Sequence, residues 1–166
     1  IVFENGGLLY VMDLATEAAR VVDVRVVTDR ATLRPHPVKV GDQLAGGDIS
    51  PSGKRAVLAA RGEIYSLPAE HGVVRNLTRT SAFAEREPAW SPDGKTIAYF
   101  SDRTGEYELT IRPADGSGEE KTVTELGPGY RYRPMWSPDS SKIAFIDNEQ
   151  VIQIVDVGSG ALTKVD

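Results

Sequence analysis

The chain has 166 residues, of which 26% are charged and 40% are hydrophobic, a balance typical of a globular protein and not of a disordered one. Its net charge is −5 and its Lys and Arg residues are scattered, which argues against nucleic acid as a partner. The absence of Cys excludes a disulfide framework, thiolate chemistry and a zinc–cysteine site, and no apolar run approaches the roughly 20 residues that span a membrane.

One phrase recurs three times along the chain. The clearest copy, W-S-P-D-G-K-T-I-A-Y-F, occupies residues 90–100, and the others occupy residues 49–58 and 136–145. Each copy predicts a strand end, a tight turn and a second strand. The copies begin at residues 49, 90 and 136, so the period is 41 and then 46 residues. Periods of roughly 40–50 residues with several strands per unit are typical of a β-propeller.

The residues of the turn 91–94 are those that a tight β-hairpin turn favours. Ser91 suits the first position, Pro92 sets φ at the second and Asp93 suits the third. Gly94 supplies the positive φ that begins the return strand. Ser140 replaces this Gly in the last copy, so we expect backbone strain there.

Each full unit is expected to contain four strands, A to D. In the second unit the predicted strands are 45–50, 55–60, 63–67 and 73–78. In the third unit they are 87–91, 96–101, 106–112 and 120–124. In the fourth unit they are 135–137, 142–146, 151–157 and 161–165. The first unit lacks strand A and offers residues 1–3, 8–14 and 20–27. No helix is expected. The predicted fold class is therefore all-β, a β-propeller fragment of about three complete four-stranded antiparallel blades plus one partial blade.

The repeats divide the chain into five segments. They are a partial blade at 1–28, a linker at 29–42, and blades at 43–80, 81–126 and 127–166. The linker carries Pro35 and Pro37, which favour an extended backbone. It is either a long loop between blades or a crossing between two propellers. The chain opens without Met, so we expect it to be a piece of a longer protein.

No catalytic constellation is found in the sequence. The two histidines, His36 and His71, lie in predicted loops, and no G-x-S-x-G elbow, phosphate loop or H-E-x-x-H motif is present. The acidic stretch 115–120 lacks the alternating carboxylates of a calcium loop, so a hairpin turn is expected there. Trp90 and Trp136, in register at the end of strand A, are expected in the core between blades. The sequence therefore predicts no catalytic residue, no cofactor and no metal.

The repeated motif and the residues around it resemble one protein family. The W-S-P-D-G-K hairpin is shared by TolB-like propellers, prolyl-oligopeptidase-type propellers and the tricorn protease. The stretches 61–80 and 84–107, beginning R-G-E-I-Y-S-L-P-A-E and A-E-R-E-P-A-W-S-P-D-G-K, resemble the first blade of tricorn's seven-bladed propeller. Residues 34–40 resemble the crossing into it from the six-bladed propeller. The departures are Ser140 at a turn Gly and the absence of most of both propellers and of the C-terminal half.

This resemblance implies a parent that is a large cytoplasmic serine peptidase, with its catalytic residues in C-terminal domains that have no counterpart here. It implies that this chain is a non-catalytic propeller segment forming part of a channel or filter for peptides. One alternative is a TolB-like scaffold propeller that binds protein partners. Another is an excised or designed propeller fragment that self-assembles.

Strand A is innermost in a propeller and lines its channel. Arg86, Arg131 and Arg133 lead into or lie in strand A of two units and are candidate channel-lining residues. They either meet peptide carboxylates or acidic side chains in the channel or, as is more usual for such charges, form local ion pairs on solvated loops. A run of three blades and a partial one leaves apolar faces at both ends. We therefore expect self-association through the open blade faces, as a dimer or a higher closed ring.

Overall fold

The structure, a computed structural model, describes residues 1–25, 27 and 36–165. The chain divides into two compact units, Ile1–Val38 and Lys39–Asp166. Half of the predicted linker, residues 29–35, lies outside the described residues, and so do residues 34 and 35 of the stretch 34–40 that resembles the tricorn crossing. The linker's last residues contribute to a short 3-10 turn, Gly41–Gln43.

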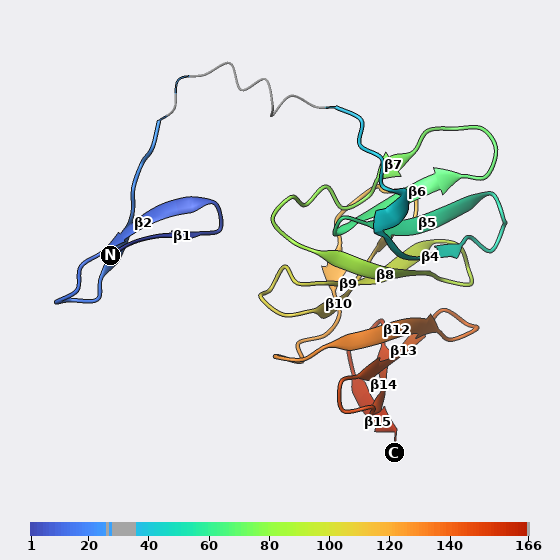
Figure 1. The fold of residues 1–166 in the computed structure, drawn as a ribbon. Helices are drawn as coiled ribbons and strands as arrows, with labels where there is room; N and C mark the ends of the chain where they lie inside the picture. Colours follow the sequence, from blue (N-terminus) through green and yellow to red (C-terminus); the bar gives the residue numbers. More distant parts are fainter. Residues whose placement is uncertain (26, 28–35, 166) are drawn as a thin grey trace. The chain divides into compact units, whose positions relative to one another are not determined.

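The first unit contains one three-stranded antiparallel sheet, as predicted for a blade without strand A. Its strands are β1 (Val2–Asn5), β2 (Leu8–Met12) and β3 (Ala19–Val21), in that order; Figure 1 labels β1 and β2. Phe3 stacks on Tyr10 across β1 and β2, with ring centroids 5.2 Å apart. The predicted third strand, 20–27, is shorter in the structure, because pairing with β2 ends at Val21.

The second unit consists of three four-stranded antiparallel sheets (Figure 1). The strands of the first are β4 (Leu44–Ile49), β5 (Arg55–Ala60), β6 (Glu63–Pro68) and β7 (Arg75–Asn76). Those of the second are β8 (Glu85–Trp90), β9 (Thr96–Ser101), β10 (Glu108–Pro113) and β11 (Lys121–Thr122). Those of the third are β12 (Arg131–Trp136), β13 (Lys142–Asp147), β14 (Ile152–Asp156) and β15 (Leu162–Val165).

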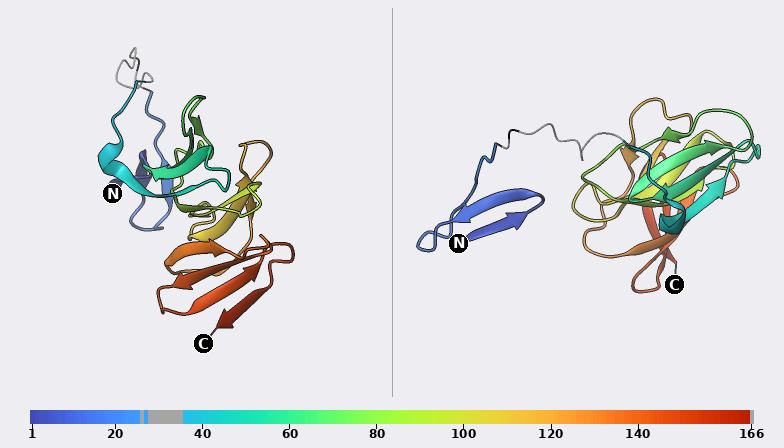
Figure 2. Two further views of the ribbon diagram at one scale, coloured as in Figure 1. Left: turned by 90° about the vertical axis from the view of Figure 1, so that its right-hand side faces the viewer. Right: turned by 45° about the horizontal axis from the view of Figure 1, so that its top comes forward.

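Each sheet is a meander in which every strand pairs with the next one along the chain; Figure 2 gives two further views. The first strands of the three sheets, β4, β8 and β12, follow one another through the unit, with β8 between the other two (Figure 1). This is the arrangement of consecutive propeller blades, with strand A of each blade on the inside. The all-β, propeller-fragment prediction is confirmed.

The turn chemistry predicted from the repeated phrase is also confirmed. Gly94 has φ 76° and Ser140 has φ 60°. The Ser91 hydroxyl accepts a hydrogen bond from the Thr96 amide (2.9 Å) and donates one to the Asp93 carboxylate (2.6 Å). Side chain and backbone therefore close this turn together, and Ser140 adopts a left-handed conformation that L side chains disfavour.

Two outer strands, β7 and β11, end earlier than predicted, and in both a side chain takes a backbone hydrogen bond near that end. The Thr78 hydroxyl accepts the Ile64 amide hydrogen bond (3.1 Å) that a longer β7 would otherwise take. Thr124 does the same for Leu109 in the next sheet (2.9 Å). A hydroxyl thus replaces a strand carbonyl at the outer edge of both blades.

Two apolar cores lie between the three sheets. The first joins side chains of the first two sheets: Val57, Ala59, Ile64, Leu77, Trp90, Ile97, Tyr99 and Ala114. The second joins the second and third sheets: Ala98, Phe100, Leu109, Val123, Ile143, Phe145 and Val155. Strand β9 contributes alternate residues to both cores, so it is apolar on both faces because both faces are covered.

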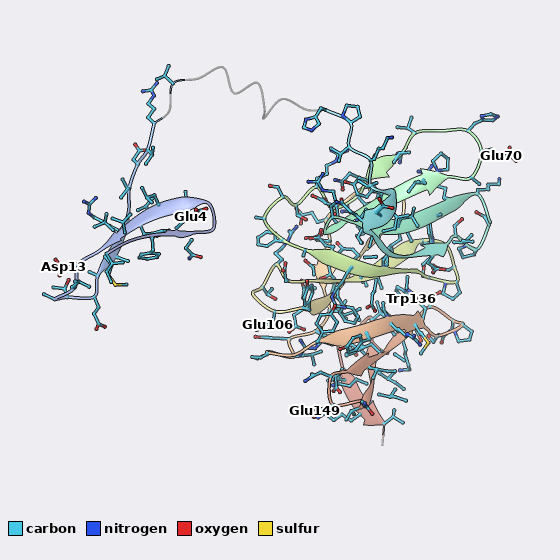
Figure 3. The ribbon with its side chains drawn as sticks, in the orientation of Figure 1. Glu4, Asp13, Glu70, Glu106, Trp136 and Glu149 are labelled. Atoms are coloured by element: carbon cyan, nitrogen blue, oxygen red, sulfur yellow. The ribbon has the colours of Figure 1, made fainter. Side chains whose placement is uncertain are left out.

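The two tryptophans lie at these inter-sheet cores, as predicted. Trp90 is buried and donates its indole N–H to the Gly94 carbonyl (3.1 Å). Trp136, labelled in Figure 3, packs against the second core and donates its indole N–H to the Ala89 carbonyl of the neighbouring sheet (3.1 Å). The tryptophan at the end of strand A therefore links successive blades.

The end sheets of the second unit have one face that is not covered within that unit. In the third sheet, Phe145 is buried, whereas Met135, Ile152 and Val165 are exposed. In the first sheet, Ile49 is 67% exposed. Both faces follow the alternation of their strands and carry apolar side chains that a further blade or a second chain can cover. No helix in the described ranges has the length and apolarity to traverse a bilayer.

Candidate functional site

The inner strands form a shallow hollow of about 540 Å³. Its lining residues lie on β4, β8 and β12, apart from Pro92. The hollow is therefore lined by strand A of each blade, and we call these three strands the wall. Each of these strands contains a β-bulge with a residue of positive φ: Gly46 (140°), Glu87 (52°) and Arg133 (53°). Bulges re-aim side chains, and non-glycine residues held in the left-handed region cluster at functional sites.

Two carboxylates of this wall link neighbouring strands. Asp48 on β4 accepts the backbone N–H of Trp90 on β8 (2.7 Å). Glu87 on β8 accepts the backbone N–H of Arg133 on β12 and also pairs with the guanidinium of Arg86 (3.2 Å). The acidic groups of the hollow are therefore used to join consecutive blades.

Arg133 is the cation that remains available on this wall. Its side chain is exposed and lines the hollow. Across the described part of the chain, its guanidinium makes no hydrogen bond or ion pair. Its backbone is held by the bulge and by the Glu87 carboxylate. An exposed guanidinium on a fixed backbone suits a carboxylate ligand.

The other two arginines predicted to line the channel are buried. Arg131, 4% exposed, donates hydrogen bonds to the carbonyls of Tyr107 (3.1 Å), Gly129 (2.8 Å) and Gly127 (2.7 Å). It fastens the 127–129 segment to the loop between β9 and β10. The channel-lining role of all three arginines stays a prediction, and of the three only Arg133 lines the hollow.

Arg86, 9% exposed, lies among aromatic rings. Its guanidinium carbon lies 3.6 Å from the ring centroid of Tyr130, 4.1 Å from that of Tyr107 and 5.4 Å from that of Phe100. Its Nε and Nη2 have no hydrogen-bond partner among the described residues, so the ring faces are the main partners of this buried cation. The sequence analysis singled out Arg86, but nothing in it indicated that Tyr107, from a separate loop, or Tyr130 would contact this side chain.

A second hollow, of about 740 Å³, lies at the outer edge of the first two sheets of this unit. It contains four arginines, but most are paired internally. Arg75 donates to the Asp115 carbonyl (2.8 Å), Arg103 pairs with Glu120, and Arg112 donates to the Leu77 carbonyl. Arg75 and Arg112 therefore join the two blades, and the pairing of these cations leaves little charge for a ligand.

Buried carboxyl and hydroxyl groups extend this contact inward. Glu85, 1% exposed, accepts a hydrogen bond from the Thr80 hydroxyl (2.6 Å). Burial raises the pKa of Glu85, and the negative charges of Glu63 and Glu120 raise it further. Burial together with the hydrogen bond to Glu120 (2.6 Å) also raises the pKa of Tyr99. The contact between the first two sheets therefore favours a protonated Glu85.

Both histidines lie in loops, as predicted. His36 and His71 are both exposed. The acidic stretch 115–120 forms the predicted turn, in which Asp115 accepts the Ser117 amide (2.8 Å). Among the residues that the structure describes, no group of three or more His, Asp or Glu side chains has an arrangement that could hold a metal ion.

Comparison with known proteins identifies the family. The profile described as the TolB beta propeller domain matches residues 4–163. The chain belongs to the TolB β-propeller family. Among curated relatives, tricorn protease homolog 2 of Streptomyces coelicolor is 30% identical over 113 residues, which is 67% of this chain and 10% of that protein. Tricorn protease homolog 1 of the same organism is 24% identical over 172 residues, which is 100% of this chain and 16% of that protein.

Solved structures agree with this assignment. A TolB structure from Agrobacterium tumefaciens has a TM-score of 0.62 and 26% identity, and the match covers 99% of this chain and 57% of that one. The tricorn protease has a TM-score of 0.63 at 15% identity, over 99% of this chain and 15% of that one, which shows a shared fold. The resemblance to tricorn and TolB propellers is confirmed. The TolB-family chain spans only 10–16% of the length of the curated tricorn homologs it matches.

Proposed function

We propose that this TolB-family segment is a non-catalytic part of a tricorn-type peptidase and forms part of the wall of a peptide channel. The curated relatives are named tricorn protease homologs, and the chain corresponds to a small share of their length. On this proposal the parent carries its serine peptidase chemistry in other domains and works in the cytoplasm. The segment guides peptides and contributes no catalytic group.

One observation carries the proposal. Arg133 lines the hollow of strands β4, β8 and β12 and is exposed, while Asp48 and Glu87 accept hydrogen bonds from backbone amides of the neighbouring strand. A peptide passing along this wall therefore meets an available cation beside carboxylates that are already bonded. The terminal carboxylate or an acidic side chain of the peptide is the natural partner of Arg133.

A direct test compares a short N-acetylated peptide that ends in a free carboxylate with the same peptide ending in an amide. Binding to the whole chain is followed by isothermal titration calorimetry at low salt, because exposed ion pairs weaken with ionic strength. We expect the carboxylate peptide to bind more tightly, and Arg133→Gln to abolish the difference. Arg61→Gln is a matched control, since Arg61 is also exposed and has φ 54° but lies outside the hollow. Equal binding of both peptides to the unchanged chain contradicts the proposal.

A TolB-like scaffold that recruits protein partners is the second candidate. The family profile and the Agrobacterium tumefaciens structure, which the chain covers to 57%, favour it. A scaffold is expected to bind a folded partner through a larger surface, and Arg133→Gln then changes affinity only slightly. Short peptides that show no binding at all, together with a folded partner retained by the chain, would decide for the scaffold.

A further inference from the structure

The exposed tyrosines beside Arg133 form a second recognition feature. Tyr130 and Tyr132 are 42% and 40% exposed, and their ring centroids lie 4.7 Å apart. Tyr130 also contacts Tyr107 edge-to-face at 5.7 Å. Two large rings that stay in contact while remaining accessible form a stacking platform. We call Tyr130 and Tyr132 the tyrosine pair.

Arg86 packs against Tyr130, one member of this pair. Its guanidinium packs on the Tyr130 ring at 3.6 Å and on the Tyr107 ring at 4.1 Å, and Glu87 accepts a hydrogen bond from it at 3.2 Å. A planar cation held between two rings restricts how both rings tilt. Tyr107 lies in the loop between β9 and β10, next to Glu106, which Figure 3 labels. Tyr130 is thus held in place before any ligand arrives, which lowers the entropic cost of binding.

The tyrosine pair adjoins the cation in the sequence, at the bulge of β12. Along a regular strand, consecutive side chains point to opposite faces. Here the register shifts between Tyr132 and Met135, and Tyr132 and Arg133 are both exposed although they are neighbours. A ring platform and an available guanidinium therefore occupy adjacent positions on the same strand.

We propose that the tyrosine pair and Arg133 together form a subsite for peptides that carry an aromatic side chain next to a carboxylate. The aromatic side chain stacks on the tyrosine pair, and the carboxylate binds the Arg133 guanidinium. Arg86 is a positioning residue, because it holds Tyr130 and does not itself reach the ligand. This inference rests on the proposed function and adds the class of peptide that the wall selects.

The experiment uses two N-acetylated peptides that end in phenylalanine or in alanine, each with a free carboxylate. Their affinities for the whole chain are measured by calorimetry. We expect the phenylalanine peptide to bind about tenfold more tightly, since stacking on an ordered ring contributes on this scale. Tyr132→Leu keeps apolar bulk, removes the ring face, and is expected to reduce the ratio to about one. Tyr10→Leu, in the first unit, is the control and keeps the ratio.

Arg86→Met tests the positioning role separately. Because Arg86 is buried, far-ultraviolet circular dichroism must first show that the variant retains its sheet content. We expect the preference for phenylalanine to fall while the preference of the carboxylate over the amide peptide persists. An unchanged preference for phenylalanine in this variant overturns the role given to Arg86.

The outcomes separate the two proposals. If both peptides bind equally and Arg133→Gln weakens both, the aromatic subsite is wrong and the channel-wall function stands. If Tyr132→Leu leaves a tenfold preference intact, the ring is recognised elsewhere and the subsite is also wrong. If neither peptide binds, the proposed function fails and the subsite fails with it.

Discussion

The strained turn residue Ser140 offers a quantitative test of how the blades are built. Its φ of 60° lies in the left-handed region, and its hydroxyl accepts a hydrogen bond from the Asp93 amide of the neighbouring blade (3.1 Å). Ser140→Ala keeps the strained backbone and removes the bond, which we expect to cost about 1 kcal/mol of unfolding free energy. Ser140→Gly removes the bond as well but relieves about 1 kcal/mol of strain. The Gly variant should therefore be close to the unchanged chain in stability.

The equivalent position in the preceding blade provides the matched control. Gly94 has φ 76°, and a Cβ added there meets no atom within 4 Å. Gly94→Ala therefore adds backbone strain without a clash, and we expect it to cost about 1–2 kcal/mol. Stability is measured by urea unfolding followed by tryptophan fluorescence, since Trp90 and Trp136 lie in the inter-sheet cores.

The comparison between variants is the decisive quantity. The account predicts that Ser140→Gly exceeds Ser140→Ala in stability by about 1 kcal/mol, because the two differ only in the left-handed strain. If Ser140→Ala is as stable as Ser140→Gly, or if Gly94→Ala leaves the unfolding free energy unchanged, the positive φ of the repeated turn does not affect stability. The hairpin argument drawn from the sequence would then be refuted.

Three further predictions follow from the contacts between blades. Glu85→Gln should flatten the pH dependence of stability. Because the pKa of Glu85 is raised in the folded state, its stabilising contribution is present below the ordinary pKa of 4.5 and is lost as pH rises through the higher folded value. Urea unfolding at several pH values should show this loss for the unchanged chain and not for the variant. Trp136→Phe should cost about 1 kcal/mol through the lost hydrogen bond to the Ala89 carbonyl, and thermal unfolding that shows no loss contradicts that link. We also propose that the open sheet faces associate, as a dimer or a higher closed ring, so light scattering should give a mass above the monomer that Ile152→Glu reduces, whereas a monomer at high concentration refutes this.

The hairpins could be predicted from the sequence because their causes are local. The turn 91–94 needs Ser, Pro, Asp and Gly at fixed positions, and the following strand 96–101 has the bounds that its apolar run predicts. The outer strand edges could not be predicted from propensity. The hydroxyls of Thr78 and Thr124 replace part of the strand pairing there, and this depends on residues more than ten positions away.

The candidate site was less predictable for the same reason. The sequence pointed to Arg86, Arg131 and Arg133 as a group, but their environments depend on tertiary contacts. Arg131 is buried and donates hydrogen bonds to three backbone carbonyls, and Arg86 packs against aromatic rings from other segments. Arg133 becomes available because a bulge turns it outward and because Glu87 is occupied by its backbone. A single sequence shows neither the bulge nor Tyr107 beside Arg86.

The most direct test of the account is to map where a peptide contacts the chain. Two-dimensional NMR spectra of the isotope-labelled chain are recorded while an acetylated peptide ending in phenylalanine is added. The account predicts that the largest shift changes cluster on the inner strands, at Glu87, Tyr132 and Arg133, and that Arg133→Gln removes them. Shift changes confined to the outer strands β7, β11 and β15, or to the hollow that contains Arg75, would contradict the proposal that strand A forms a peptide-binding wall.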